Sequence, residues 1–168
     1  MTYKRFEDLP VWQAAAELFE RTDDFLAKPL ARLRSSFRNQ LERAVLSISN
    51  NIAEGFERGT TKELLHFIYI SRGSSGEVRS MLSLLNRRPW AKELETEISG
   101  LKASAEGCSR QLRAWADSLQ NSEITGQRHL NDRTKREFDQ KKRAEAMQKR
   151  LLNNLPPNHP LRRAQSEG

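Results

Sequence analysis

The stretch from residue 40 to residue 59, QLERAVLSISNNIAEGFERG, limits the possible folds more than any other part of the chain. Its apolar residues recur at intervals of three and four, which is the pattern of a helix that buries one face. These residues are Leu41, Ala44, Val45, Ile48, Ile52 and Phe56. Gly55 lies on the same face, although glycine costs a helix about 1 kcal/mol relative to alanine. A glycine there predicts the close approach of another backbone.

A stripe of polar residues lies beside this apolar face. It comprises Gln40, Ser47, Asn51, Glu54 and Arg58. Because buried polar groups are normally hydrogen-bonded, we interpret the stretch as a core helix with a hydrogen-bonded polar edge. Glu54 and Glu77 are a second possibility, since two facing carboxylates can transfer protons or hold a metal. We favour a structural role, in which Arg58, Arg72 or a hydroxyl pairs with Glu54.

Several short motifs surround the same stretch. They are Gln40-Leu41, Arg43-Ala44, NIAEG (51–55) with Arg58, FEDLPVW (6–12), and RGS (72–74) followed by Glu77. In these motifs the chain resembles a bacterial four-helix-bundle family found in intervening sequences of large-subunit ribosomal RNA genes. The resemblance covers about residues 3–120 and implies a structural motif made of Asn51, Glu54, Gly55, Arg58 and Glu77.

The accessory proteins of diversity-generating retroelements are more distant relatives with the same bundle. These relatives form pentameric basic barrels that engage RNA and a reverse transcriptase. The resemblance therefore implies a homo-oligomer, most simply a pentamer, with a nucleic-acid partner and a reverse transcriptase as a further partner.

Four amphipathic segments joined by short breaks predict an all-α fold, an antiparallel up-down-up-down four-helix bundle over residues 1–120. We expect Asp8 to cap the first helix, Gly59 to end the second, and Thr60 with Glu63 to open the third as a capping box. The expected helices span about 9–27, 30–56, 61–86 and 90–119. Residues 121–168 form a basic extension, which we expect to be helical or disordered because its apolar residues are sparse.

The third expected helix is apolar over an unusually wide arc, which indicates more than one neighbour to bury against. The residues that widen the arc, and that we assign to an oligomer interface, are Phe67, Ile70, Met81 and Leu84. The same helix contains a run of small residues from Ser71 to Gly76. We expect this run to meet Gly55 across the helical hairpin.

The chain is basic, with a net charge of +7 and a pI of about 9.9, which favours an anionic partner. Residues 122–168 hold eleven Lys or Arg against six Asp or Glu, so this segment carries most of the excess charge. The cations that we assign to RNA or single-stranded DNA are Arg32, Arg34, Arg38, Arg43, Arg87, Arg88, Arg133, Lys135, Arg136, Lys141, Lys142 and Arg143. Guanidinium groups match phosphate oxygens, but the same arginines can instead form a solvated face.

The sequence contains no convincing catalytic set. Its three histidines lie in different segments, and the single Cys108 falls within an apolar stripe, where it behaves as a small hydrophobe. We therefore expect no enzymatic activity, no cofactor and no metal. No apolar stretch is long enough to span a membrane, and the first residues lack the apolar core of a signal peptide, so we expect a cytoplasmic protein.

Two hypotheses of function remain open. In the first, the chain is a nucleic-acid-binding accessory protein without sequence preference, of the kind that assists the reverse transcriptase of a diversity-generating retroelement. In the second, it is an oligomeric protein–protein interaction scaffold, and its charge serves only solubility.

Overall fold

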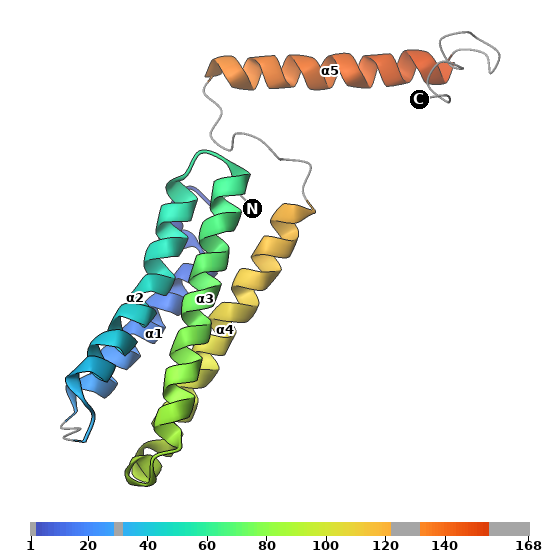
Figure 1. Cartoon of the computed structure of the whole chain (residues 1–168). Coiled ribbons are helices and arrows are strands. Elements are labelled where there is room, and N and C mark those ends of the chain that lie inside the picture. Colours follow the sequence, from blue (N-terminus) through green and yellow to red (C-terminus); the bar gives the residue numbers. More distant parts are fainter. Residues whose placement is uncertain (1–2, 29–31, 122–131, 155–168) are drawn as a thin grey trace. The chain divides into compact units, whose positions relative to one another are not determined.

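The computed structural model describes residues 3–28, 32–121 and 132–154, and within the last range it describes side chains for residues 140–153. These residues form helices and turns, and none of them lies in a strand. The elements are η1 (Phe6–Asp8), α1 (Pro10–Ala27), α2 (Ser35–Glu57), α3 (Thr61–Asn86), η2 (Pro89–Leu94), α4 (Glu95–Gln120) and α5 (Asp132–Asn154) (Figure 1). The chain divides into two units, Met1–Arg128 and His129–Gly168.

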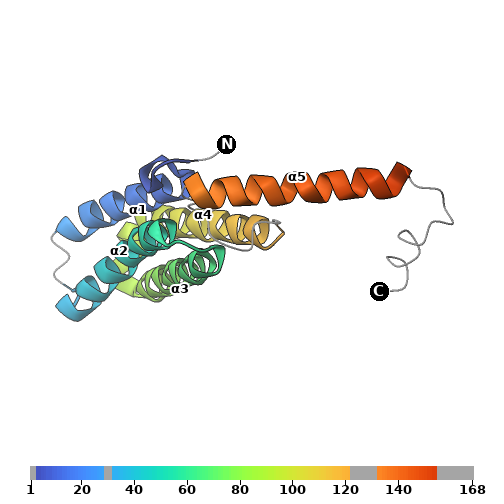
Figure 2. The same ribbon diagram turned by 90° about the horizontal axis from the view of Figure 1, so that it is seen from above.

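In the first unit, each of the four long helices packs against two others. α1 contacts α2 and α4, and α3 contacts the same two helices. Figure 1 shows the chain reversing its direction between α2 and α3 and again between α3 and α4, and Figure 2 shows the four helices side by side. As a consequence, the α1–α2 connection and the α3–α4 connection lie at the same end of the unit.

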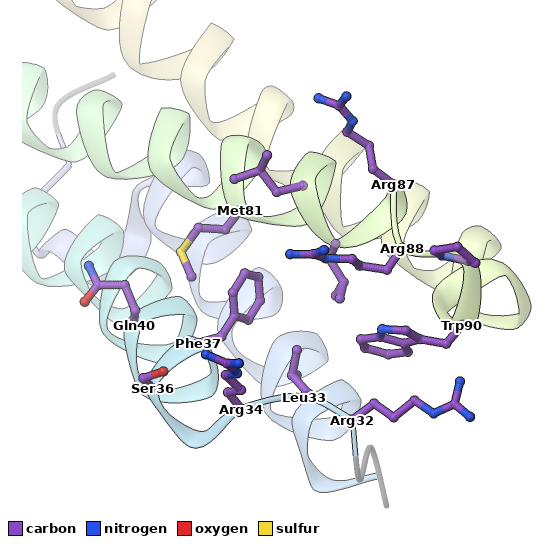
Figure 3. A pocket seen from close by; sticks show the side chains of 13 residues that line it. Arg32, Leu33, Arg34, Ser36, Phe37, Gln40, Met81, Arg87, Arg88 and Trp90 are labelled. Atoms are coloured by element: carbon purple, nitrogen blue, oxygen red, sulfur yellow. The ribbon is translucent and has the colours of Figure 1, made fainter.

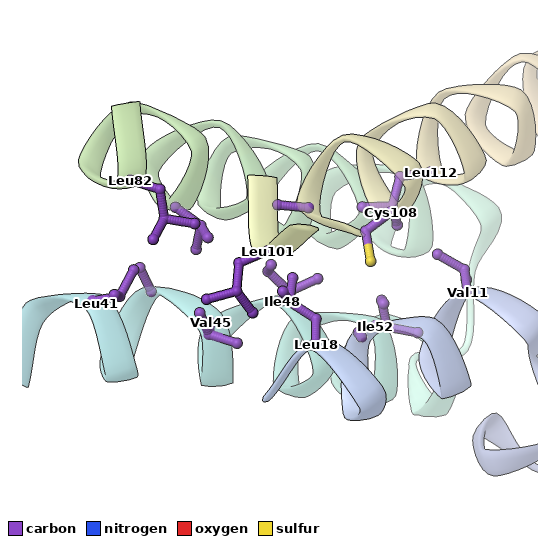
Figure 4. Close-up of a cluster of buried hydrophobic side chains, with 14 of the residues drawn as sticks. Val11, Leu18, Leu41, Val45, Ile48, Ile52, Leu82, Leu101, Cys108 and Leu112 are labelled. Atoms are coloured by element: carbon purple, nitrogen blue, oxygen red, sulfur yellow. The ribbon is translucent and has the colours of Figure 1, made fainter. Parts of the chain in front are cut away.

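The core lies between these four helices (Figure 4). The apolar face predicted for the second helix is confirmed, since all six of its residues are buried. Ile98 of α4 and Ala91 of η2 are both completely buried in this core.

Two helix starts differ from those predicted. The second helix begins at Ser35 and not near residue 30, because Arg34 has an extended backbone with φ −64° and ψ 142°. The fourth segment begins with the 3₁₀-helix η2, in which the Ala91 N–H donates to the Arg88 carbonyl, and becomes α-helical only at Glu95.

The capping predictions have mixed outcomes. Asp8 does not cap α1, because it belongs to η1, and Leu9 occupies the N-cap position without a side-chain bond. Gly59 follows the C-cap residue Arg58 of α2, as predicted, but it does not adopt the left-handed conformation typical of that position, since no described residue has a positive φ. Thr60 is confirmed as the N-cap of α3, because its Oγ1 accepts from the Glu63 N–H at 3.2 Å. The Glu63 carboxylate accepts from the Thr60 hydroxyl at 2.8 Å, whereas a complete capping box pairs it with the backbone N–H of the N-cap residue.

Within the described ranges, no helix has both the length and the apolar character that crossing a membrane requires. In the second unit, α5 is strongly polar, and its described side chains are exposed except for Leu152, which is half-buried. Met147 and Leu151 are the large hydrophobic residues among the exposed ones.

Candidate nucleic-acid interface

The polar stripe of α2 is bonded partly to α3 and partly within itself. Gln40 Nε2 donates to Glu77 Oε1 at 2.5 Å, and the hydroxyls of Ser47 and Ser74 lie 2.9 Å apart. Asn51 Nδ2 donates to the Ser47 carbonyl at 2.7 Å and to its hydroxyl at 2.9 Å. No fully buried side-chain nitrogen or oxygen in the described part of the chain lacks a partner. The buried polar groups of the stripe therefore have their hydrogen-bond partners within α2 and α3.

Glu54 pairs with Arg58 one helical turn away, at 2.5 Å, and both side chains are about half exposed. The hydrogen bond that Arg58 donates to the Glu54 carboxylate raises the pKa of Arg58 above its ordinary value. Glu54 does not meet Glu77. Glu77 bonds to Gln40, which lies fourteen residues before Glu54 on the same helix, or about 21 Å along its axis. The alternative of a facing carboxylate pair is therefore wrong.

Gly55 lies at a close contact between α2 and α3. A Cβ atom at Gly55 would lie 2.7 Å from Phe67 Cβ, 3.2 Å from Leu64 Cδ1 and 3.4 Å from the Leu64 carbonyl oxygen. The close approach is thus confirmed, but its partners are Leu64 and Phe67 and not the run from Ser71 to Gly76. In that run Ser71 instead donates to the Ile48 carbonyl at 2.9 Å.

A groove of about 1050 Å³ lies at the end of the unit where the α1–α2 and α3–α4 connections meet (Figure 3). We call it the basic groove. Four arginines line it, and they are Arg32, Arg34, Arg87 and Arg88. Its apolar lining consists of Leu33, Phe37, Met81, Leu84, Leu85, Pro89 and Trp90, and Ser36 and Gln40 complete it.

All four arginines of the basic groove are exposed. None of them forms an ion pair with a carboxylate of the described residues, whereas Arg58, Arg79, Arg110 and Arg113 each do. Four uncompensated guanidiniums around one hollow create a positive potential that favours an anion. Planar guanidiniums bind phosphate oxygens with two hydrogen bonds, so the groove is chemically suited to a phosphate backbone.

The other predicted cations are dispersed. Arg38 is half-buried and donates to the backbone carbonyls of Leu26 and Lys28. It therefore serves as a hydrogen-bond donor to the C-terminal end of α1. Arg43 is exposed on α2 outside the basic groove. In α5, Lys141, Lys142 and Arg143 are exposed. The side chains of Arg133, Lys135 and Arg136 lie outside the described ones, so their part in binding stays a prediction.

The residues assigned to an oligomer interface do not form one free patch. Ile70 and Leu84 are 39% and 55% exposed. Phe67 is half-buried and lies beneath the Arg58 guanidinium, which is 5.2 Å from its ring centroid. Met81 and Leu84 line the basic groove. Part of the apolar width of α3 therefore belongs to a candidate binding site.

Sequence reasoning did not identify Phe37 and Trp90 as groove residues. Both are half-buried, and they line the groove from α2 and from η2. One signal was present in the sequence. Arg32 and Arg34 lie at the start of the second expected helix and Arg87-Arg88 follow the third, and in a bundle with reversing helices these two positions lie at one end.

No group of three His, Cys, Asp or Glu side chains among the described residues is arranged to hold a metal ion. Cys108 is completely buried, and this burial raises the pKa of its thiol to about 11. A thiol that stays protonated and inaccessible is not a nucleophile.

The sequence was also compared with known proteins. The model of one protein family, described as 23S rRNA-intervening sequence protein, matches residues 7–114. No curated protein matches the chain. The match covers more than half of the 168 residues, so the chain belongs to the 23S rRNA-intervening sequence protein family.

Proposed function

We propose that this member of the 23S rRNA-intervening sequence protein family is a non-enzymatic RNA-binding protein that holds RNA phosphates in the basic groove. The antiparallel up-down-up-down four-helix bundle is the scaffold of this proposal, because such a topology brings the two arginine-bearing connections to one end. The observation that carries the proposal is the set of four exposed arginines without carboxylate partners in the described residues. The family name, which refers to 23S rRNA, is compatible with it.

A salt titration of RNA binding tests the role of the groove. The variant combines Arg32→Gln, Arg34→Gln, Arg87→Gln and Arg88→Gln, and binding of a labelled RNA is followed by fluorescence anisotropy. Each lost phosphate contact on a single strand flattens the plot of log K against log salt by about 0.7. We therefore expect the slope to flatten by about 3 and the affinity at low salt to fall.

The control must remove the same charge elsewhere. Lys4, Lys62, Arg110 and Arg113 are exposed and lie outside the groove, so their combined replacement by Gln has an equal effect on net charge. The proposal requires the control to keep most of the affinity. Equal losses in both variants would point to net charge alone, and no RNA retention by the native chain at about 50 mM salt would refute RNA binding.

Two finer proposals concern partners. We propose that the bundle forms a homo-oligomer, and a pentamer by resemblance to the retroelement relatives, with the exposed Ile70 as support. Light scattering at micromolar concentration tests this, and a monomer would rule it out. The second proposal is that the protein assists a reverse transcriptase. It predicts that the two proteins co-purify when they are expressed together.

A further inference from the structure

The basic groove has an apolar lining that phosphate binding alone does not require. Phe37 enters it from α2 and Trp90 from η2, and Figure 3 shows both rings among the arginine side chains. Both rings are half-buried, so each keeps accessible surface. Neither has an aromatic partner among the described residues, whereas Trp12 packs edge-on against Phe6 at a centroid distance of 5.3 Å.

We propose that the basic groove takes unpaired RNA nucleotides, with a base stacked on Trp90 and the adjoining phosphates on the arginines. This inference rests on the proposed function and names the class of RNA that the groove selects. Single-strand binding sites combine a positively charged groove that follows the backbone with aromatic side chains on which bases stack. The basic groove has both components within one hollow.

A duplex fits these features less well. In a paired helix the faces of the bases are covered by their neighbours, so only phosphates and groove edges would reach the protein. The rings of Phe37 and Trp90 would then face a hydrated backbone, as would Leu84, which is 55% exposed. Binding a duplex would therefore bury little of their apolar surface. An unpaired base presents an apolar face of its own and covers these side chains.

A second copy of the chain is the other occupant to consider, because the groove includes exposed apolar surface. Charge argues against it. Another copy of a chain with a net charge of +7 would have to approach four arginines that no described carboxylate neutralises. RNA supplies the negative charge that the groove lacks and, at unpaired positions, the flat apolar surface as well. Arginine also stacks on bases, so its presence at all four positions serves both contacts.

The test compares two RNAs with the same hairpin and the same number of phosphates. One has a single-stranded 3′ tail of six uridines, and in the other the tail is abasic. We expect the full-length protein to bind the tail with bases about tenfold more tightly, which lies within the range measured for stacking of one base. Trp90→Ala should abolish this preference, and Trp90→Tyr should keep most of it.

Fluorescence gives a direct readout in a full-length chain in which Trp12 and Trp115 are replaced by Phe. Trp90 is then the sole tryptophan, and we expect the uridine tail to quench its emission while the abasic tail does not. A thermal melt checks that each variant is folded. If Trp90→Ala does not fold, the affinities of the protein that retains Trp90 for the two RNAs still test the inference.

The outcomes separate the two claims. Equal, salt-dependent binding of both RNAs would overturn the stacking inference and leave RNA binding in place. Loss of binding to both would overturn the proposed function itself. A change in Trp90 emission with protein concentration, in the absence of RNA, would place a second copy in the groove and would also overturn the inference.

Discussion

At the scale of single residues, Gly55 determines how closely α2 and α3 can approach. Its neighbour across the interface is Phe67 Cβ, an atom fixed to the backbone, so a side chain at Gly55 cannot be accommodated by rotating a flexible group. The same contact positions the Phe67 ring beneath Arg58. Gly55 therefore has a packing role that is independent of any ligand.

Replacing Gly55 by Ala should lower the free energy of unfolding by about 1–3 kcal/mol, because the added methyl group overpacks the interface. Gly73→Ala is the matched control. Gly73 is also inside a helix, but a Cβ there would meet no heavy atom within 4 Å, so we expect a gain of up to about 1 kcal/mol from helix propensity. Urea unfolding measures both, and equal stability of the two variants would contradict the packing role.

Cys108 provides a prediction of pH dependence. Its thiol has a pKa of about 11 in the folded chain, above its ordinary value of about 9, because burial disfavours the thiolate. The unfolded chain releases this proton first as the pH rises. The thiol's contribution to stability is therefore complete below about pH 9 and decreases as the pH rises toward 11.

Comparing the melting temperature of the unsubstituted protein with that of Cys108→Ala isolates this effect, since other groups titrate alike in both. We expect the stability advantage of the unsubstituted chain to shrink as the pH rises from about 7 to about 10.5. Curves that remain parallel over this range would show that folding does not raise the pKa of the Cys108 thiol.

At the scale of elements, the sequence predicted those features that depend on local periodicity. The buried face of α2 and the limits of α3 follow from apolar spacing and from Thr60 with Glu63. The start of α2 was wrong, because the apolar spacing continues through Leu33 although Arg34 is extended. The groove was missed because its two sides are more than forty residues apart, and only the packed bundle brings Phe37 and Trp90 together.

A substitution of Thr60 tests whether the N-cap stabilises the start of α3. Thr60→Ala removes the acceptor for the Glu63 N–H and should lower stability by about 1 kcal/mol. Thr96→Ala is the control, since Thr96 is exposed in the first turn of α4 and is not its N-cap. Thermal unfolding of the two variants compares them, and a Thr60 variant as stable as the Thr96 variant would show that packing alone holds this end of α3.

At the scale of the whole molecule, charge and packing are distributed unequally along the chain. Residues 1–121 contain the long buried helices and carry a net charge of about +2, whereas residues 122–168 carry about +5. The groove arginines are fixed by the bundle, and the exposed cations of α5 add charge without a comparable core. The proposed RNA binding would therefore have two contributions, one from a shaped site and one from total charge.

Deleting residues 122–168 should separate these contributions. We expect the shortened chain to keep its helicity and cooperative melting, because the core cluster lies within residues 9–116. RNA affinity should fall and the salt slope should flatten, since phosphate contacts from the basic segment are lost. The preference for an unpaired tail over an abasic one should survive, because it depends on Trp90. If the shortened chain bound RNA without that preference, the selectivity would have to reside in the deleted segment instead of the groove.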